Sequence, residues 1–121
     1  MPSHRRTAKR RYTVGMTEPD PDLVRALRAL ANPVRLQLLT WLREPHRHFA
    51  LADATVDVEE FGVCVSHIQE KAGLAQSTVS AYLAELQRAG LVRATRVGKW
   101  THYKRDDARI ARIVAALGKA I

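Results

Sequence analysis

Four side chains near the middle of this 121-residue chain could bind a metal ion or act as a nucleophile. Cys64 is the single cysteine, and His67 follows it at a Cys-x-x-His spacing. His46 and His48 lie upstream, two residues apart. A thiolate and imidazoles suit soft or borderline metal ions. Alternatively, Cys64 is a redox-active thiol or a small buried hydrophobe, and the histidines are ordinary surface residues.

Enzymatic chemistry has little support in the sequence. The chain contains neither a Gly-rich phosphate loop nor a nucleophile elbow, and no nucleophile, histidine and carboxylate occur at a recognisable spacing. We therefore expect a protein that is not an enzyme and that has no cofactor. No apolar run approaches the ~18 residues of a membrane span, and no apolar segment follows the basic N-terminus as in a secretory signal. These features indicate a cytoplasmic protein with no membrane partner.

The segment from residue 65 to residue 105 has the pattern of a helix-turn-helix followed by a β-hairpin. Gly73 is placed to break the chain between two short helices. The second helix carries Val79, Leu83 and Leu86 at i, i+4 and i+7, which predicts one buried stripe. Two strand-like segments then flank Gly98-Lys99, a two-residue loop that suits a type II′ turn. A hairpin directly after a recognition helix is a wing.

Small and polar residues gather at the N-terminal end of the second helix, the end that a recognition helix presents to DNA bases. The expected base-contacting residues are Gln76, Ser77, Ser80 and Ala81. The expected contacts to the DNA backbone are Thr78, Tyr82, Arg96, Lys99, His102 and Lys104. The alternatives are that Ser77 or Thr78 caps the helix and that His102 is an ordinary strand residue.

The distribution of charge agrees with a nucleic-acid partner. The net charge is +8, and residues 1–15 hold five basic residues and no acidic one. Residues 64–105 hold seven basic and two acidic residues, whereas residues 16–63 have a net charge of −3. Positive charge therefore coincides with the helix-turn-helix and its wing, which is the electrostatic footprint expected for double-stranded DNA. Residues 1–17 are expected to form a flexible basic arm, either a solvated tail or a further DNA contact.

The remaining segments predict further helices within one domain, residues 18–121. One helix ends near Leu30, and Asn32-Pro33 caps and starts the next, which runs to about Arg43. Residues 44–63 form a long acidic connector. The terminal helix, from Asp106 to Ile121, carries an apolar stripe that a second copy of the chain would cover. The expected dimer-interface residues are Leu23, Leu27, Ile110, Ile113, Val114 and Leu117.

Three blocks of the sequence resemble the ArsR/SmtB family of winged-helix repressors. LANPVRLQLLTWL (30–42) resembles the family's second-helix block, GLAQSTVSAYLAELQRAGLV (73–92) its helix-turn-helix, and TRVGKWTHYK (95–104) its wing. The resemblance implies a mainly α fold with a small β-hairpin, a winged helix-turn-helix of about five helices plus a two-stranded wing. It also implies a homodimer that binds an imperfect palindrome in a promoter and represses until a signal, an unknown inducer here, releases it.

The sequence departs from the family at the sites that sense metal. Members that sense metal at the first helix of the helix-turn-helix carry Cys-Val-Cys, where this chain has Cys64-Val65-Ser66. The terminal helix has no histidine. We therefore expect a repressor without a well-formed metal site. Two alternatives stay open: a metal- or thiol-responsive repressor that senses through Cys64 and His67, with His46 and His48 as further ligands, and a winged helix used as a protein-interaction module.

Overall fold

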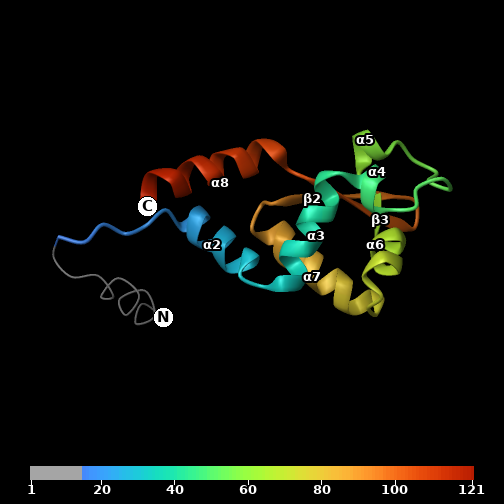
Figure 1. Ribbon diagram of the computed structural model, residues 1–121, viewed down its shortest axis with the longest axis horizontal. Coiled ribbons are helices and arrows are strands. Elements are labelled where there is room, and N and C mark those ends of the chain that lie inside the picture. The colour runs from blue at the N-terminus through green and yellow to red at the C-terminus, as the bar shows by residue number, and fades with distance from the viewer. Residues whose placement is uncertain (1–14) are drawn as a thin grey trace.

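The structure, a computed structural model, describes residues 15–121, so most of the expected basic arm lies outside it. The described part is mainly α-helical with one small antiparallel sheet (Figure 1). Its helices are α2 (Pro21–Leu30), α3 (Pro33–Arg43), α4 (Pro45–His48), α5 (Val58–Phe61), α6 (Val65–Ala72), α7 (Gln76–Arg88) and α8 (Asp107–Ala120). Its strands are β1 (Val63–Cys64), β2 (Val92–Val97) and β3 (Trp100–Arg105). The two helices beyond the expected five are the single turns α4 and α5 in the connector.

Side-chain caps explain where three of the helices begin. The Asn32 carboxamide oxygen accepts hydrogen bonds from the backbone N–H groups of Val34 and Arg35, both at 3.0 Å. Asp106 caps α8 in the same way, through the N–H of Arg109 at 3.0 Å. At α2 the cap is Asp20, and Pro21 takes the first helical position, where a missing N–H costs nothing.

The wing is the expected hairpin, with an added third strand. Strands β2 and β3 pair from Val92–Arg105 to Val97–Trp100, which leaves Gly98 and Lys99 as the loop. Gly98 has φ +61°, and every other residue with positive φ in the described chain is also glycine, as a type II′ turn requires. Strand β1 pairs with the free edge of β3, so the sheet has the order β1-β3-β2 rather than two strands.

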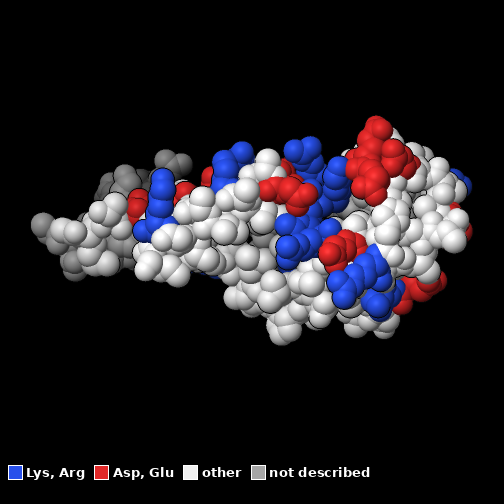
Figure 2. Space-filling model, turned by 45° about the horizontal axis from the view of Figure 1, so that its top comes forward, with Lys and Arg blue, Asp and Glu red and all other residues white. Residues whose placement is uncertain are grey.

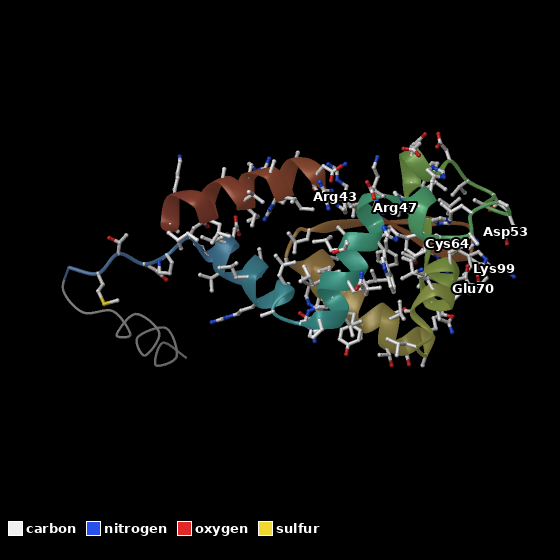
Figure 3. The ribbon with its side chains drawn as sticks, viewed as in Figure 1. Arg43, Arg47, Asp53, Cys64, Glu70 and Lys99 are labelled. Atoms are coloured by element: carbon white, nitrogen blue, oxygen red, sulfur yellow. The ribbon has the colours of Figure 1, made fainter. Side chains whose placement is uncertain are left out.

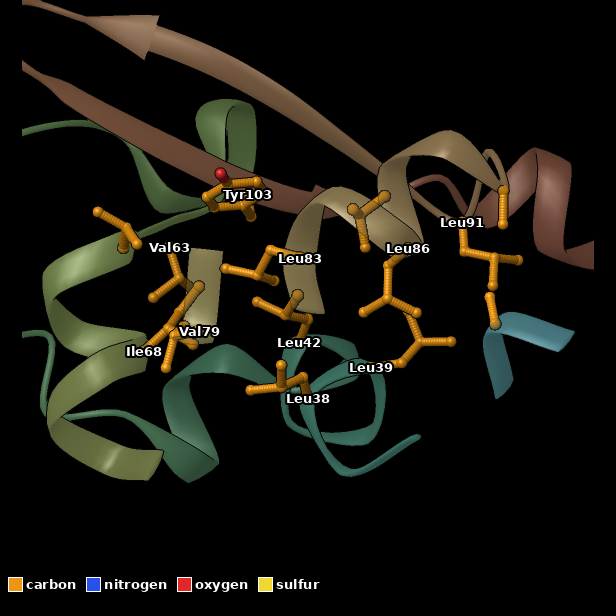
Figure 4. Close-up of a cluster of buried hydrophobic side chains, with 14 of the residues drawn as sticks. Leu38, Leu39, Leu42, Val63, Ile68, Val79, Leu83, Leu86, Leu91 and Tyr103 are labelled. Atoms are coloured by element: carbon orange, nitrogen blue, oxygen red, sulfur yellow. The ribbon is translucent and has the colours of Figure 1, made fainter. Parts of the chain in front are cut away.

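The hydrophobic core lies between this sheet and the helices α3, α6 and α7 (Figure 4). The expected stripe of α7 is fully buried: Val79, Leu83 and Leu86 have no exposed surface. Leucines of α3 and Ile68 of α6 pack against it. Because the buried face of α7 is fixed by these contacts, its opposite face must point to solvent.

The helices α2 and α8 pack against each other at one end of the molecule (Figure 1). Two residues expected at a dimer interface are already buried within the single chain: Leu23 is 5% exposed and Ile113 is 7% exposed. That expectation is therefore wrong for both. Leu27 and Val114 remain 39% and 62% exposed, and Ile110 and Leu117 are half-buried. The stripe on α8 thus serves the core with one edge and leaves the other uncovered.

Candidate nucleic-acid interface

The exposed face of α7 carries the residues expected to read DNA bases. Gln76, Ser77 and Ala81 are exposed and Ser80 is half-buried, all in the first two turns of the helix. The N-cap of α7 is Ala75, whose side chain cannot accept a hydrogen bond, so neither Ser77 nor Thr78 is the cap. The N-terminal end of α7 therefore offers small polar side chains that are free to contact a ligand.

The wing tip holds the positive charges that are not neutralised. Among the basic residues of this region, Arg88 pairs with Glu85, Arg93 with Asp106 at 3.2 Å, and Arg105 with Asp107 at 3.0 Å. Arg96 and Lys99 are exposed and form no ion pair with any residue from 15 to 121. Arg96 instead donates to the carbonyl of Gly98 at 3.2 Å, which holds it beside the turn.

Not every residue expected at the DNA backbone is available there. His102 is only 4% exposed, because its side chain lies on the sheet face that the connector covers, so the expected phosphate contact by His102 is wrong. Lys104 lies at the base of the wing, opposite Arg93, and its ammonium group donates to the backbone carbonyl of Glu59. Thr78 is exposed, and Tyr82 is half-buried with the Arg35 guanidinium 6.0 Å from its ring centre.

Charge is not uniform over the molecule. Figure 2 shows a face on which Lys and Arg are interleaved with Asp and Glu, as expected where ion pairs neutralise basic residues. Interleaved charge of this kind does not favour a polyanion. The candidate interface is therefore confined to the N-terminal half of α7 and to the wing tip.

The four residues considered for a metal site are not brought together. His46 bonds to the Glu59 carboxylate at 2.7 Å on the outside of the connector, and His67 bonds to Asp53 at 2.8 Å. Cys64 accepts a hydrogen bond from the Ser66 hydroxyl at 3.2 Å. Within residues 15–121, no three His, Cys, Asp or Glu side chains are grouped to hold a metal ion. The set of Cys64, His67, His46 and His48 is therefore not a site in this structure.

The structure adds two features that the sequence did not reveal. The hydrogen bond from His67 lowers the pKa of the Asp53 carboxyl and ties the connector to α6. The Arg35 guanidinium donates to the carbonyls of Ala29, at 2.7 Å, and Arg28, at 3.3 Å, which closes the junction between α2 and α3. Both join residues that have no local pattern in common, so periodicity could not predict them.

Comparison with known proteins agrees with this arrangement. The model of the bacterial regulatory protein arsR family matches residues 63–94, from β1 to the start of β2. The HTH-type transcriptional regulator YbzH of Bacillus subtilis is 49% identical over 90 residues, which cover 74% of this chain and 89% of YbzH. This chain belongs to the ArsR family. It is a transcriptional regulator with a DNA-binding winged helix-turn-helix.

Two further relatives extend the comparison. A protein of Streptomyces lividans named "Probable mercury resistance operon repressor" is 37% identical over 101 residues, or 84% of this chain and 67% of that protein. Among solved structures, the homodimeric winged helix-turn-helix DNA-binding domain Mb0332 of Mycobacterium bovis has 26% identity and a TM-score of 0.58, and the alignment covers 89% of each chain. None of the helices within residues 15–121 has the length and apolar character to cross a membrane.

Proposed function

We propose that this ArsR-family chain is a homodimeric repressor that binds an imperfect palindrome in promoter DNA. In this proposal, α7 enters the major groove and reads bases with Gln76, Ser77, Ser80 and Ala81. Thr78, Tyr82 and the wing-tip residues Arg96 and Lys99 contact phosphates. Phosphate contacts position the protein, whereas contacts to base edges select the sequence.

The observation that carries the proposal is the pairing of an exposed polar helix end with an unneutralised wing tip. Gln76 and Ser77 face solvent at the start of α7 because the other side of that helix is locked in the core. Lys99 stands at the turn of the hairpin that follows α7. In winged helix-turn-helix proteins the recognition helix lies in the major groove, and basic side chains nearby contact the flanking phosphates.

Dimerisation in this proposal uses the uncovered edge of α2 and α8. Leu27, Val114 and Ile121 are large apolar side chains with 39%, 62% and 95% exposure. The M. bovis neighbour is described as homodimeric, which supports the same assembly here. Two copies related by a twofold axis would present two α7 helices to two half-sites of a palindrome. The proposed place of action is the cytoplasm, where promoter DNA is reached.

The proposal includes no metal ion. The S. lividans relative is named for mercury resistance, but the matching residues here supply one thiol, Cys64, and His67 is bound to Asp53. The alternative of a protein-interaction module is tested by the same experiment as the repressor, because such a module would have no preference among DNA sequences.

The test is binding to the protein's own upstream DNA, and the decisive variant is Gln76→Ala. Loss of a bidentate contact between glutamine and adenine should cost about 1–3 kcal/mol on the preferred sequence and relax the preference at one base-pair position. Fluorescence anisotropy against a set of single-substitution duplexes measures both effects.

Gln87→Ala is the matched control, because Gln87 is an exposed glutamine at the opposite end of the same helix. It should leave both affinity and sequence preference unchanged. If Gln76→Ala bound every duplex as the wild type does, the assignment of α7 as the base-reading element would be wrong.

A further inference from the structure

A cavity of about 210 Å³ lies between the connector and the sheet, at the end of the molecule that carries the wing tip. Val56 and other connector residues form one wall, Cys64 and His67 form another, and Trp100 and His102 of β3 form the floor. Figure 3 shows Asp53 of the connector, Cys64 and Lys99 at the same end of the molecule. The long connector, whose role the sequence left open, therefore encloses a hollow beside the DNA-binding elements.

The pairing of β1 with β3 explains why Cys64 and His102 share this cavity. Cys64 lies directly opposite His102 in the register, and Val63 lies opposite Tyr103. Successive side chains of a strand point to opposite faces. Val63 and Tyr103 are buried in the main core, at 0% and 8% exposure, so Cys64 and His102 face the other way, toward the connector.

Two imidazoles of the cavity have a nitrogen that lacks a hydrogen-bond partner in the described chain. Nδ1 of His102 and Nδ1 of His67 are both buried and unpaired within residues 15–121. His67 bonds through Nε2 to the Asp53 carboxylate, which can only accept, so Nε2 carries the proton and Nδ1 of the neutral ring is a base. Buried polar atoms normally have partners, so these two are placed to bind a ligand.

The thiol of Cys64 is held at the cavity wall. Its sulfur accepts a hydrogen bond from the Ser66 hydroxyl at 3.2 Å, and Cys64 is the N-cap residue of α6. No second cysteine exists in the chain, so an intramolecular disulfide is excluded. The grouping of ligands for a metal ion is also missing among residues 15–121. The remaining chemistry for a thiol beside a basic imidazole is addition to an electrophilic carbon.

We propose that this cavity captures a small uncharged enone, a carbonyl compound conjugated to a C=C bond, by addition of Cys64. The volume equals about seven water molecules at ~30 Å³ each, which suits a single six-membered ring. Val56 and Trp100 offer apolar surface to the ring, and the imidazoles of His67 and His102 can bond to the carbonyl oxygen. The apolar walls disfavour a charged ligand.

The reaction is balanced without any further reagent. The thiol proton passes to an imidazole nitrogen, and the sulfur lone pair forms a bond to the β-carbon of the enone. The π electrons of the C=C bond move to give an enolate, and the imidazolium returns the proton to it. The net result is addition of S–H across the double bond, with no oxidation or reduction by a third component.

Such an adduct would act on the elements that bind DNA, and this part of the inference rests on the proposed function. Cys64 caps α6, the first helix of the helix-turn-helix, and Trp100 directly follows the wing-tip residue Lys99. A ring fixed between them would alter the position of the wing relative to α6. We expect the adduct to weaken binding to upstream DNA by about tenfold, an ordinary size for coupling between two sites.

The experiment uses cyclohex-2-enone as the probe on the full chain and follows the adduct by intact-mass spectrometry. The rate, normalised to that of N-acetylcysteine with the same reagent, should exceed the normalised rate of a bulky bicyclic enone by about tenfold, because only the small ring enters the cavity. Cys64→Ser should give no adduct. Val56→Trp, which fills the cavity and leaves the sulfur, should remove the preference for the small ring.

The outcomes separate the site from its effect on DNA. Equal normalised rates for the two enones would mean ordinary surface thiol reactivity and would overturn the site. Selective capture with unchanged DNA affinity would overturn the regulatory role. If the unmodified protein bound no DNA at all, the proposed function would fail, and the rates would still decide whether the cavity captures enones.

Discussion

Gly62 shows how one residue makes the sheet possible. Its φ of +89° lies in a region that favours glycine, and a Cβ there would stand 2.0 Å from the carbonyl oxygen of Tyr103. No side chain can occupy that space while β1 pairs with β3. The sequence offered no sign of this, because the contact joins two segments that are far apart in the chain.

We therefore expect Gly62→Ala to destabilise the fold by about 3 kcal/mol or more, since the clash adds to the cost of the unfavourable backbone. Urea denaturation monitored by circular dichroism measures the loss. Gly73→Ala is the control: Gly73 also has a positive φ, +68°, but nothing lies within 4 Å of its Cβ position. It should cost about 1 kcal/mol. Equal losses for both variants would contradict the predicted clash.

Other single residues mark the limit of sequence reasoning. The alternation along β3 correctly put His102 on the face opposite Tyr103, but it could not reveal that the connector covers that face. On α8, Ile113 and Val114 are neighbours on one predicted stripe, yet the first is buried and the second is exposed. Periodicity identifies an apolar stripe, but the packing of α2 decides how much of it one chain can cover.

Among the elements, those with local signals were predicted well. Asn32-Pro33 starts α3 and Gly98-Lys99 turns the wing because cap and turn preferences depend on a few adjacent residues. The connector was the failure. Its single-turn helices α4 and α5 and the strand β1 are stabilised by distant partners, such as the pairing of Val63 with Tyr103. Short elements of this kind have too few residues for a periodic pattern.

The helix α8 depends on its cap, which gives a prediction about pH. The N–H of Arg109 donates to Asp106 and is the main reason that the pKa of this carboxyl is lowered. A lowered pKa means that the stabilisation is present above the unfolded-state pKa of about 3.9 and is lost as the pH falls through the folded-state value. Stability from this cap should therefore be constant near neutral pH and decline below about pH 4.

Asp106→Asn isolates this effect, because asparagine is an equally good N-cap but does not titrate. Chemical denaturation from pH 7 to pH 3 should show a smaller acid loss for Asp106→Asn than for the wild type. Asp106→Ala should cost about 1 kcal/mol at pH 7. Identical acid profiles for the wild type and Asp106→Asn would show that the cap carboxylate has no role in the pH dependence.

At the scale of the whole molecule, the uncovered edge of α2 and α8 predicts how the chain assembles. Val114→Glu places a charge at the centre of the proposed dimer contact, and we expect it to weaken dimerisation by more than about tenfold while the chain stays folded. Sedimentation velocity over a concentration series measures this. Ala108→Glu, an exposed position on a different side of α8, should leave dimerisation intact. A Val114→Glu variant as dimeric as the wild type would move the interface elsewhere.

The central claim is sequence-specific DNA binding by α7 with the wing tip on the phosphates. The most direct measurement is binding to the upstream duplex and to a scrambled duplex over a range of salt concentrations, for the wild type, Lys99→Ala and Arg43→Ala. Arg43 is an exposed cation that lies well apart from Lys99 (Figure 3), so it controls for the loss of charge alone.

We predict tighter binding to the upstream duplex and a steep fall in affinity with salt. Lys99→Ala should weaken both duplexes about equally and make the log–log salt slope shallower by about 1 for each site contacted, whereas Arg43→Ala should not change it. Equal affinity of the wild type for the two duplexes, with a salt slope that Lys99→Ala leaves unchanged, would contradict the account.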